Sequence, residues 1–252
     1  MTDIRVVAFD LDDTLAESKS AVHPDMTAAL LKLLERRPVC VISGGRFEQF
    51  DQQLLQRLPA SPSLADLHLM PTCGTRYLRW QDEGWQLIYA HDLTPEEKSA
   101  AIAAIEAAAK DLGYWGSDAD VFGARIEDRG SQITYSALGQ EAPVAPKKAW
   151  DPDGSKRELL RAAISKEIPE LEVRAGGSTS IDVTTKGVDK AYGMQRLAEL
   201  LDVAPAEILF IGDRLEPGGN DYPVIAVGVQ THAVTGPDET LTYIEELLPT
   251  LG

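Results

Sequence analysis

Apolar positions in the first eighty residues alternate between short continuous runs and helical spacing. Residues 4–9 form an apolar run that predicts a buried strand, and residues 25–37 place leucines at helical spacing. The same alternation predicts strand 38–42, helix 46–58 and strand 67–71. It returns near the C-terminus as helix 189–201, strands 208–211 and 224–229, and helix 238–248. This order predicts an α/β fold with a Rossmann-like, doubly wound parallel sheet and right-handed crossovers.

The middle of the chain has a different pattern. Period-2 alternation predicts strands with one open face over residues 84–91, 131–136, 171–175 and 179–184. Two helices accompany them, one from a capping box of Thr94 and Glu97 to about residue 112, and one over 155–168 from a capping box of Ser155 and Glu158. We therefore predict an α+β cap domain at 84–186, inserted into a core of residues 1–83 and 187–252. Hinges are expected near 82–84 and 185–188.

Composition narrows the class of protein. The chain has 252 residues, with 40 acidic against 24 basic side chains and a net charge of -16. This charge repels nucleic-acid phosphates and anionic lipid, so we expect neither partner, whereas a metal or a few local bases could still admit a small phosphorylated metabolite. The 2 cysteines cannot form a disulfide framework, and no apolar run is long enough for a signal or membrane segment. We expect a cytoplasmic protein.

Carboxylates follow two of the predicted parallel strands. Asp10 and Asp12 end the first apolar run, and Asp213 follows a later one, with Asn220 and Asp221 close behind. Ligands of open α/β sheets bind beyond the carboxyl ends of the strands, and Mg²⁺ prefers oxygen ligands. These residues are therefore candidates for a magnesium site, although each cluster alone is also typical of a turn or a helix cap.

Two other segments carry weaker signals. Ser43 and Gly44 lie between a strand and a helix, where a hydroxyl and backbone amides can bind an anion. Lys190 opens the helix after the insert, and a single lysine is more often a solvated surface group. Four such signals, each at the end of a core segment, weigh more than any one of them.

In their order along the chain these segments resemble the four motifs of the haloacid dehalogenase superfamily of aspartate-nucleophile phosphotransferases: Asp10-Leu11-Asp12-Asp13-Thr14, Ser43, Lys190, and Gly212-Asp213 with Asn220-Asp221. The insert lies between the second and third motifs. That is its position in subfamily IIB, whose members carry a C2-type cap.

The resemblance implies a role for each motif residue. Asp10 is the nucleophile that takes the phosphoryl group, and Asp12 is the general acid for the leaving oxygen and then the base for the attacking water. Ser43 and Lys190 bind the phosphoryl group. The Mg²⁺ cofactor is assigned to Asp10, the carbonyl of Asp12 and Asp213, and Asn220 and Asp221 complete the metal site by orienting the groups around the ion.

Within the superfamily, residues 176–183 and 187–190 resemble the α-phosphomannomutases. That resemblance assigns Ser180 and Asp182 to sugar hydroxyls and Arg129 to a phosphate clamp. Where the mutases have further arginines, this chain has Lys19, Gln140 and Lys147. Lysine lacks the bidentate fork of arginine and glutamine has no charge, so the clamp is weaker and hydrolysis is favoured. Residues 129–132 and 150–153 resemble bacterial hydrolases of the same subfamily.

Three functions stay open. The leading hypothesis is a Mg²⁺-dependent phosphohydrolase, that is, a phosphatase, acting on a small phosphorylated metabolite such as a sugar phosphate. The alternative is a phosphohexomutase such as a phosphomannomutase. A non-catalytic module that binds a phosphosugar is the third, and the presence of Asp10, Asp12, Lys190 and Asp213 together counts against it. We expect a monomer or a cap-mediated homodimer.

Overall fold

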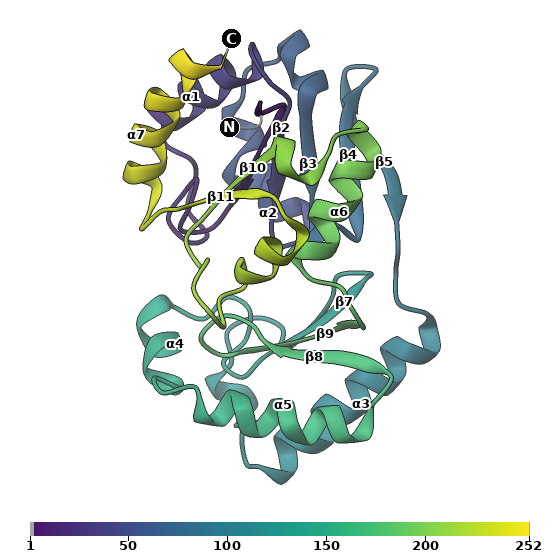
Figure 1. The fold of residues 1–252 in the computed structure, drawn as a ribbon. Coiled ribbons are helices and arrows are strands. Elements are labelled where there is room, and N and C mark those ends of the chain that lie inside the picture. Colours follow the sequence, from purple (N-terminus) through teal and green to yellow (C-terminus); the bar gives the residue numbers. More distant parts are fainter. Residues whose placement is uncertain (1–2, 252) are drawn as a thin grey trace. The chain divides into compact units, whose positions relative to one another are not determined.

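A computed structural model describes residues 3–251 and divides the chain into two compact units. The core comprises the chain up to Ala90 and from Val188 onward, and the insert comprises His91–Gly187. Figure 1 shows the elements of both units. No helix in residues 3–251 is long and apolar enough to cross a membrane.

The core contains one seven-stranded sheet in the order β11-β10-β1-β2-β3-β4-β5. Neighbours from β11 to β3 are parallel, and β4 and β5 add antiparallel at one edge. The strands are β1 Val6–Asp10, β2 Val39–Ile42, β3 Leu67–Met70, β4 Arg76–Gln81, β5 Gly84–Ala90, β10 Ile208–Gly212 and β11 Gln230–Ala233. The helices are α1 Pro24–Leu34, α2 Phe47–Gln53, α6 Lys190–Leu201 and α7 Pro237–Leu247. The predicted doubly wound α/β fold is confirmed.

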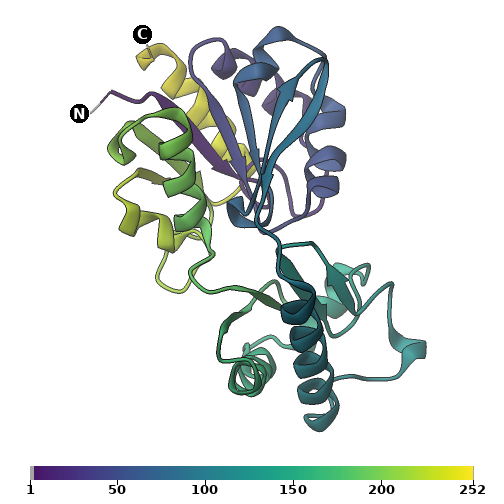
Figure 2. The same ribbon diagram turned by 90° about the vertical axis from the view of Figure 1, so that its right-hand side faces the viewer.

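Alternate residues of the core strands face two separate apolar clusters. Val7 and Phe9 pack in the cluster that contains α1 and α7, whereas Val6 and Ala8 pack in the cluster that contains α6. Helices therefore cover both faces of the sheet, as Figure 2 shows from the side. Burial on both faces explains why these strands are continuous apolar runs in the sequence.

The first predicted domain boundary is wrong, because β5 belongs to the core. It pairs with β4 through a two-residue turn in which Asp82 and Glu83 have φ of 50° and 61°. Two consecutive positive φ values are typical of a tight hairpin turn. The hinge predicted near 82–84 is therefore this turn, and the chain leaves the core only after Ala90.

The strand predicted over 224–229 is also wrong. Residues Tyr222–Val227 form a 3₁₀ helix, which has Pro223 near its start and ends at Gly228 with a φ of 89°. The edge strand β11 follows it and is only partly buried, so its apolar signal is weak. The short elements β4, β6 and α4 were not predicted.

The insert is an antiparallel four-stranded sheet in the order β6-β7-β9-β8. Its strands are β6 Ile126–Asp128, β7 Gln132–Ser136, β8 Leu171–Ala175 and β9 Ser180–Thr185, and its helices are α3 Pro95–Asp111, α4 Val144–Trp150 and α5 Ser155–Glu167. Inward residues such as Tyr135 and Val183 share one apolar cluster with α3 and α5. The prediction of two helices on one face of this sheet is confirmed.

The two predicted capping boxes have different outcomes. Thr94 and Glu97 form theirs at the start of α3. The box of Ser155 and Glu158 is wrong, because the cap of α5 lies one residue earlier, at the left-handed Gly154, and Glu158 pairs with Arg161 instead.

Candidate active site

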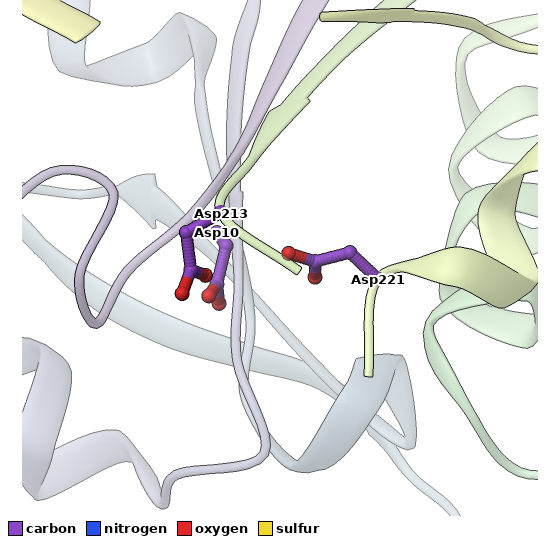
Figure 3. A group of neighbouring side chains, drawn as sticks. All are labelled: Asp10, Asp213 and Asp221. Carbon is purple, nitrogen blue, oxygen red and sulfur yellow. The ribbon is translucent and has the colours of Figure 1, made fainter. Parts of the chain in front are cut away.

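Three carboxylates meet at the carboxyl end of the core sheet. Asp10 ends β1, Asp213 directly follows the neighbouring parallel strand β10, and Asp221 follows the next loop. One oxygen of each lies within 4.8 Å of the others. Figure 3 shows Asp10 beside Asp213, with the carboxylate of Asp221 directed toward them. Adjacent parallel strands end at the same edge, so two residues far apart in sequence come together here.

Lys190 supplies the positive charge in this group. It is the first residue of α6, which Asp189 caps by accepting a hydrogen bond from the backbone N of Tyr192 at 3.1 Å. The Lys190 Nζ lies 2.6 Å from Asp10 Oδ1 and 2.5 Å from Asp221 Oδ1. All three side chains are buried. A buried lysine is rare unless it is paired, so Lys190 belongs to the site and is not a solvated surface group.

Asp221 is fixed from two sides. Its Oδ1 contacts Lys190, and its Oδ2 accepts a hydrogen bond from the backbone N of Arg214 at 3.1 Å. A Cβ at position 212 would lie 2.4 Å from Oδ2, so Gly212 leaves the room that this carboxylate needs. Because protein donors engage both oxygens, Asp221 holds Lys190 in place.

Burial and mutual repulsion alter the titration of these groups. The pKa of Asp10 is raised to about 7, mainly by burial and also by Asp221, against the lowering effect of Lys190. The pKa of Asp213 is raised by burial and by Asp221. Burial lowers the pKa of Lys190, but Asp10 and Asp221 outweigh it and leave that pKa above its usual range. Burial and the crowding of three carboxylates beside one ammonium group therefore oppose full ionisation of Asp10 and Asp213 when no further cation is present.

This donor set fits Mg²⁺. Three carboxylates face one ammonium group, and a divalent cation would compensate the remaining charge. Since Asp221 is engaged, Asp10 and Asp213 have the side-chain oxygens best suited to bind the ion, in keeping with the one or two carboxylates that Mg²⁺ usually takes. Asn220 is exposed and, within residues 3–251, makes no hydrogen bond to this group. Its predicted part in the metal site stays a prediction.

Asp12 lies two residues beyond the nucleophile candidate and has its own set of partners. Its Oδ2 accepts a hydrogen bond from Gln49 Nε2 at 2.6 Å. Its Oδ1 accepts one from Gln53 Nε2 at 3.1 Å and one from the backbone N of Lys19 at 2.8 Å. The side chain of Lys19, predicted to bind phosphate, is exposed, and it is the backbone of this residue that reaches Asp12.

Ser43 and Gly44 form a loop after β2. The Ser43 Oγ accepts a hydrogen bond from the backbone N of Gly45 at 3.0 Å, and the carbonyls of Ser43 and Gly45 accept from Cys73 and Thr72, each at 2.9 Å. Thr72 and Cys73 have φ of 49° and 56°, so two left-handed residues brace this loop. Ser43 directly follows β2, the position predicted for it, and it is buried.

The predicted substrate residues of the insert form two groups. Asp182 accepts a hydrogen bond from Thr134 Oγ1 at 2.8 Å, and Thr134 accepts one from Gln132 at 2.8 Å. Burial raises the pKa of Asp182, which nearby Arg129 opposes. Arg129 forms an ion pair with Glu127 at 2.8 Å.

The other predicted substrate residues of the insert, Lys147 and Ser180, have different partners. Lys147, on α4, donates a hydrogen bond from Nζ to the carbonyl of Gln140 at 2.9 Å. Ser180 begins β9 and bonds through its backbone to Gly176 and Gly177. The structure thus brings Arg129 near Asp182 and gives Lys147 different partners.

Several residues of these groups were not predicted. Gln49 and Gln53 lie four positions apart on one helix, and Gln132 and Thr134 lie two apart on one strand. The regular spacing is visible in the sequence. Glutamine and threonine are common on exposed faces, however, so spacing alone could not indicate that they meet Asp12 and Asp182.

Comparisons with known proteins agree with this arrangement. The family model described as haloacid dehalogenase-like hydrolase matches residues 7–227. A phosphomannomutase of Saccharomyces cerevisiae is 28% identical over 252 residues, covering 96% of this chain and 93% of that protein. A probable phosphomannomutase of Caenorhabditis elegans is 24% identical over 259 residues, covering 98% and 96%.

Solved structures share the fold at low sequence identity. The IMP-nucleotidase of Plasmodium falciparum matches 98% of this chain and 68% of its own, with a TM-score of 0.71 and 17% identity. A haloacid dehalogenase-like hydrolase of Bacteroides thetaiotaomicron matches 97% and 100%, with a TM-score of 0.65 and 14% identity. The match of the family model over most of the chain establishes the family, and the protein belongs to the haloacid dehalogenase-like hydrolases.

Proposed function

We propose that the protein is a phosphohydrolase that removes phosphate from a small phosphorylated metabolite, such as a sugar phosphate, through an aspartyl-phosphate at Asp10. The observation that carries this proposal is the buried pairing of Asp10 with Lys190. The ammonium group lies 2.6 Å from one carboxylate oxygen, which fixes the carboxylate and leaves the other oxygen to attack phosphorus.

The reaction has two steps. In the first, Asp10 forms a bond to phosphorus while the ester P–O bond breaks, and Asp12 gives a proton to the departing oxygen. In the second, a water oxygen bonds to phosphorus while the Asp10–P bond breaks, and Asp12 takes the proton of that water. Inorganic phosphate leaves, and both aspartates return to their starting states. Ser43 and Lys190 are proposed to bind the phosphoryl oxygens, because catalysis of this transfer depends on positioning and on charge.

Mg²⁺ is proposed as the cofactor. Asp10, Asp213 and the carbonyl of Asp12 would hold it, and Asp221 would keep Lys190 in place. When bound, the ion offsets negative charge on the transferring phosphoryl group.

Water is the proposed acceptor because Arg129 and Lys147, the two basic side chains of the insert that were predicted to bind phosphate, already have protein partners. Arg129 pairs with Glu127, and Lys147 bonds to the carbonyl of Gln140. A mutase has to bind a bisphosphorylated intermediate, which calls for strong, available phosphate-binding groups. Roles for Lys19, Gly44, Arg129, Lys147, Ser180 and Asp182 in binding the rest of the substrate stay predictions.

A phosphomannomutase is the second candidate. Curated relatives with that name match nearly the whole chain at 24% and 28% identity. The chemistry at Asp10 would be the same in both enzymes, and only the acceptor of the phosphoryl group would differ.

One assay separates the candidates. The purified protein is incubated with a panel of sugar phosphates in Mg²⁺ or in EDTA, and free phosphate is measured. We expect phosphate release that requires Mg²⁺, and a loss of about a thousandfold or more in Asp10→Asn because the nucleophile is removed. Asp128→Asn is the matched control, since Asp128 is an exposed residue of the insert that pairs with Lys98.

Mannose 1-phosphate with a bisphosphate activator forms the second arm of that assay. Rapid conversion to mannose 6-phosphate without free phosphate would replace the hydrolase proposal with the mutase. If the panel yields no product of either kind, and Asp10→Asn binds the sugar phosphates as the unaltered protein does, the protein is a binding module.

A further inference from the structure

The carboxylate of Asp12 is held by side chains for which the proposed reaction has so far given no role. Three N–H groups donate to it: Gln49 Nε2 to Oδ2, and Gln53 Nε2 with the backbone N of Lys19 to Oδ1. Both oxygens are therefore fixed, and the plane of the carboxylate is set by the protein. A general acid or base needs such a fixed direction, because proton transfer depends on hydrogen-bond geometry.

Helix α2 provides two of these donors. Gln49 and Gln53 are four residues apart, so they lie on one face of the helix, one turn from each other. This spacing lets one helix reach both oxygens of a single carboxylate. Gly45, just before the helix, makes room for the first amide, since a Cβ there would lie 2.1 Å from Gln49 Oε1.

Gln53 also ties the segment after Asp12 to the helix. Its Nε2 donates to the carbonyl of Ser20 at 2.9 Å as well as to Asp12, and its backbone carbonyl accepts from Val22 at 2.8 Å. Gln53 is only 3% exposed, and among residues 3–251 its buried Oε1 has no hydrogen-bond partner. A buried carbonyl without a partner is unfavourable for folding. Fold stability alone therefore does not explain a glutamine here.

We propose that Gln49 and Gln53 are positioning residues that hold the Asp12 carboxylate in the direction needed for both of its proton transfers. The proposal rests on the proposed phosphohydrolase activity. Asp12 protonates the leaving oxygen as the ester bond breaks, and it deprotonates water as the Asp10–P bond breaks. A misdirected carboxylate always slows the second step, in which water must lose a proton. It slows the first step only when the leaving group needs a proton.

This dependence on the leaving group gives the test. Gln49→Met and Gln53→Met keep a side chain of similar length and remove the amide. Both are compared with the unaltered protein on p-nitrophenyl phosphate, whose leaving group departs without a proton, and on the sugar phosphate that the panel shows to be hydrolysed fastest. Gln52→Met is the matched control, because Gln52 is an exposed glutamine of the same helix.

On the sugar phosphate we expect kcat to fall about 10- to 100-fold in the two variants, with little change in KM. On p-nitrophenyl phosphate we expect a rapid burst of one p-nitrophenol per active site, followed by slow turnover. The aspartyl-phosphate forms at the normal rate, but its hydrolysis is slow because Asp12 is poorly placed to take the proton of water. Asp12→Asn gives the same pattern more strongly. Adding Gln49→Met to Asp12→Asn gives no further loss, because the two act as a unit.

Thermal unfolding of each variant tests whether the fold persists. Gln49 is only partly buried, so Gln49→Met keeps the test valid if Gln53→Met is unstable. Equal losses on both substrates without a burst, or no loss at all, would overturn the positioning role while leaving the hydrolase intact. If the unaltered protein hydrolyses neither substrate, the proposed function fails and the positioning role fails with it.

Discussion

The core and the insert use charged residues differently. In the insert, Arg129 pairs with Glu127, Arg157 with Asp151, and Lys98 with Asp128. At the end of the core sheet, three carboxylates lie within 4.8 Å of one another, and the single Lys190 that pairs with two of them, Asp10 and Asp221, is buried with them. Paired charges are typical of structural support, whereas a buried group with unbalanced charge is costly for folding and is typical of a functional site.

The largest expected difference concerns two lysines. Lys190→Met leaves Asp10 and Asp221 buried without their cation, and loss of one partner of a buried pair costs roughly 3–5 kcal/mol. Lys98→Met breaks a partly exposed pair in the insert, where the cost is no more than about 1 kcal/mol. Denaturant unfolding of both variants in EDTA measures the two free energies. Similar losses of unfolding free energy in the two variants would show that the three carboxylates of the core depend on Lys190 no more than Asp128 depends on Lys98.

A smaller effect concerns pH. The pKa of Asp10 is about 7 in the folded protein and close to 4 in an unfolded chain, so between these values the folded state binds more protons. Stability from this group is therefore highest at low pH and falls as pH rises from about 4 to 7 in the absence of metal. Asp10→Asn removes the effect.

The measurement is the free energy of unfolding of Asp10→Asn and of the unaltered protein, in EDTA, at several pH values. The free energy of unfolding of Asp10→Asn, relative to that of the unaltered protein, should increase by roughly 2–4 kcal/mol between pH 4 and pH 7. This difference is the stability advantage of the variant. Mg²⁺ should reduce this advantage at pH 7 by binding the ionised carboxylates of the unaltered protein. An advantage that stays constant across the range would contradict a raised pKa at Asp10.

The sequence predicts the core and its site better than the boundary of the insert. Buried parallel strands are continuous apolar runs that end in functional residues, so the apolar pattern alone is enough to place Asp10, Ser43 and Asp213 at strand ends. The alternation of apolar and polar residues in β5 would suit a strand of the core or a strand of the insert. Only the pairing of β5 with β4 shows that it belongs to the core. In the same way, no local pattern indicates that Gln49 and Gln53 meet Asp12, because that contact joins distant segments.

The smallest expected effect compares the two helix starts of the insert. Thr94 accepts a hydrogen bond from the backbone N of Glu97, so Thr94→Ala should cost about 1 kcal/mol. Ser155→Ala should cost only about a few tenths of that, because at α5 the buried Asp151 accepts from the backbone N atoms of Lys156 and Arg157 in place of a serine cap. Hydrogen exchange of the first-turn amides of α3 and α5 measures both effects. Equal losses of protection in the two helices would restore the capping box predicted for Ser155 and would show that Asp151 is not the group that satisfies the start of α5.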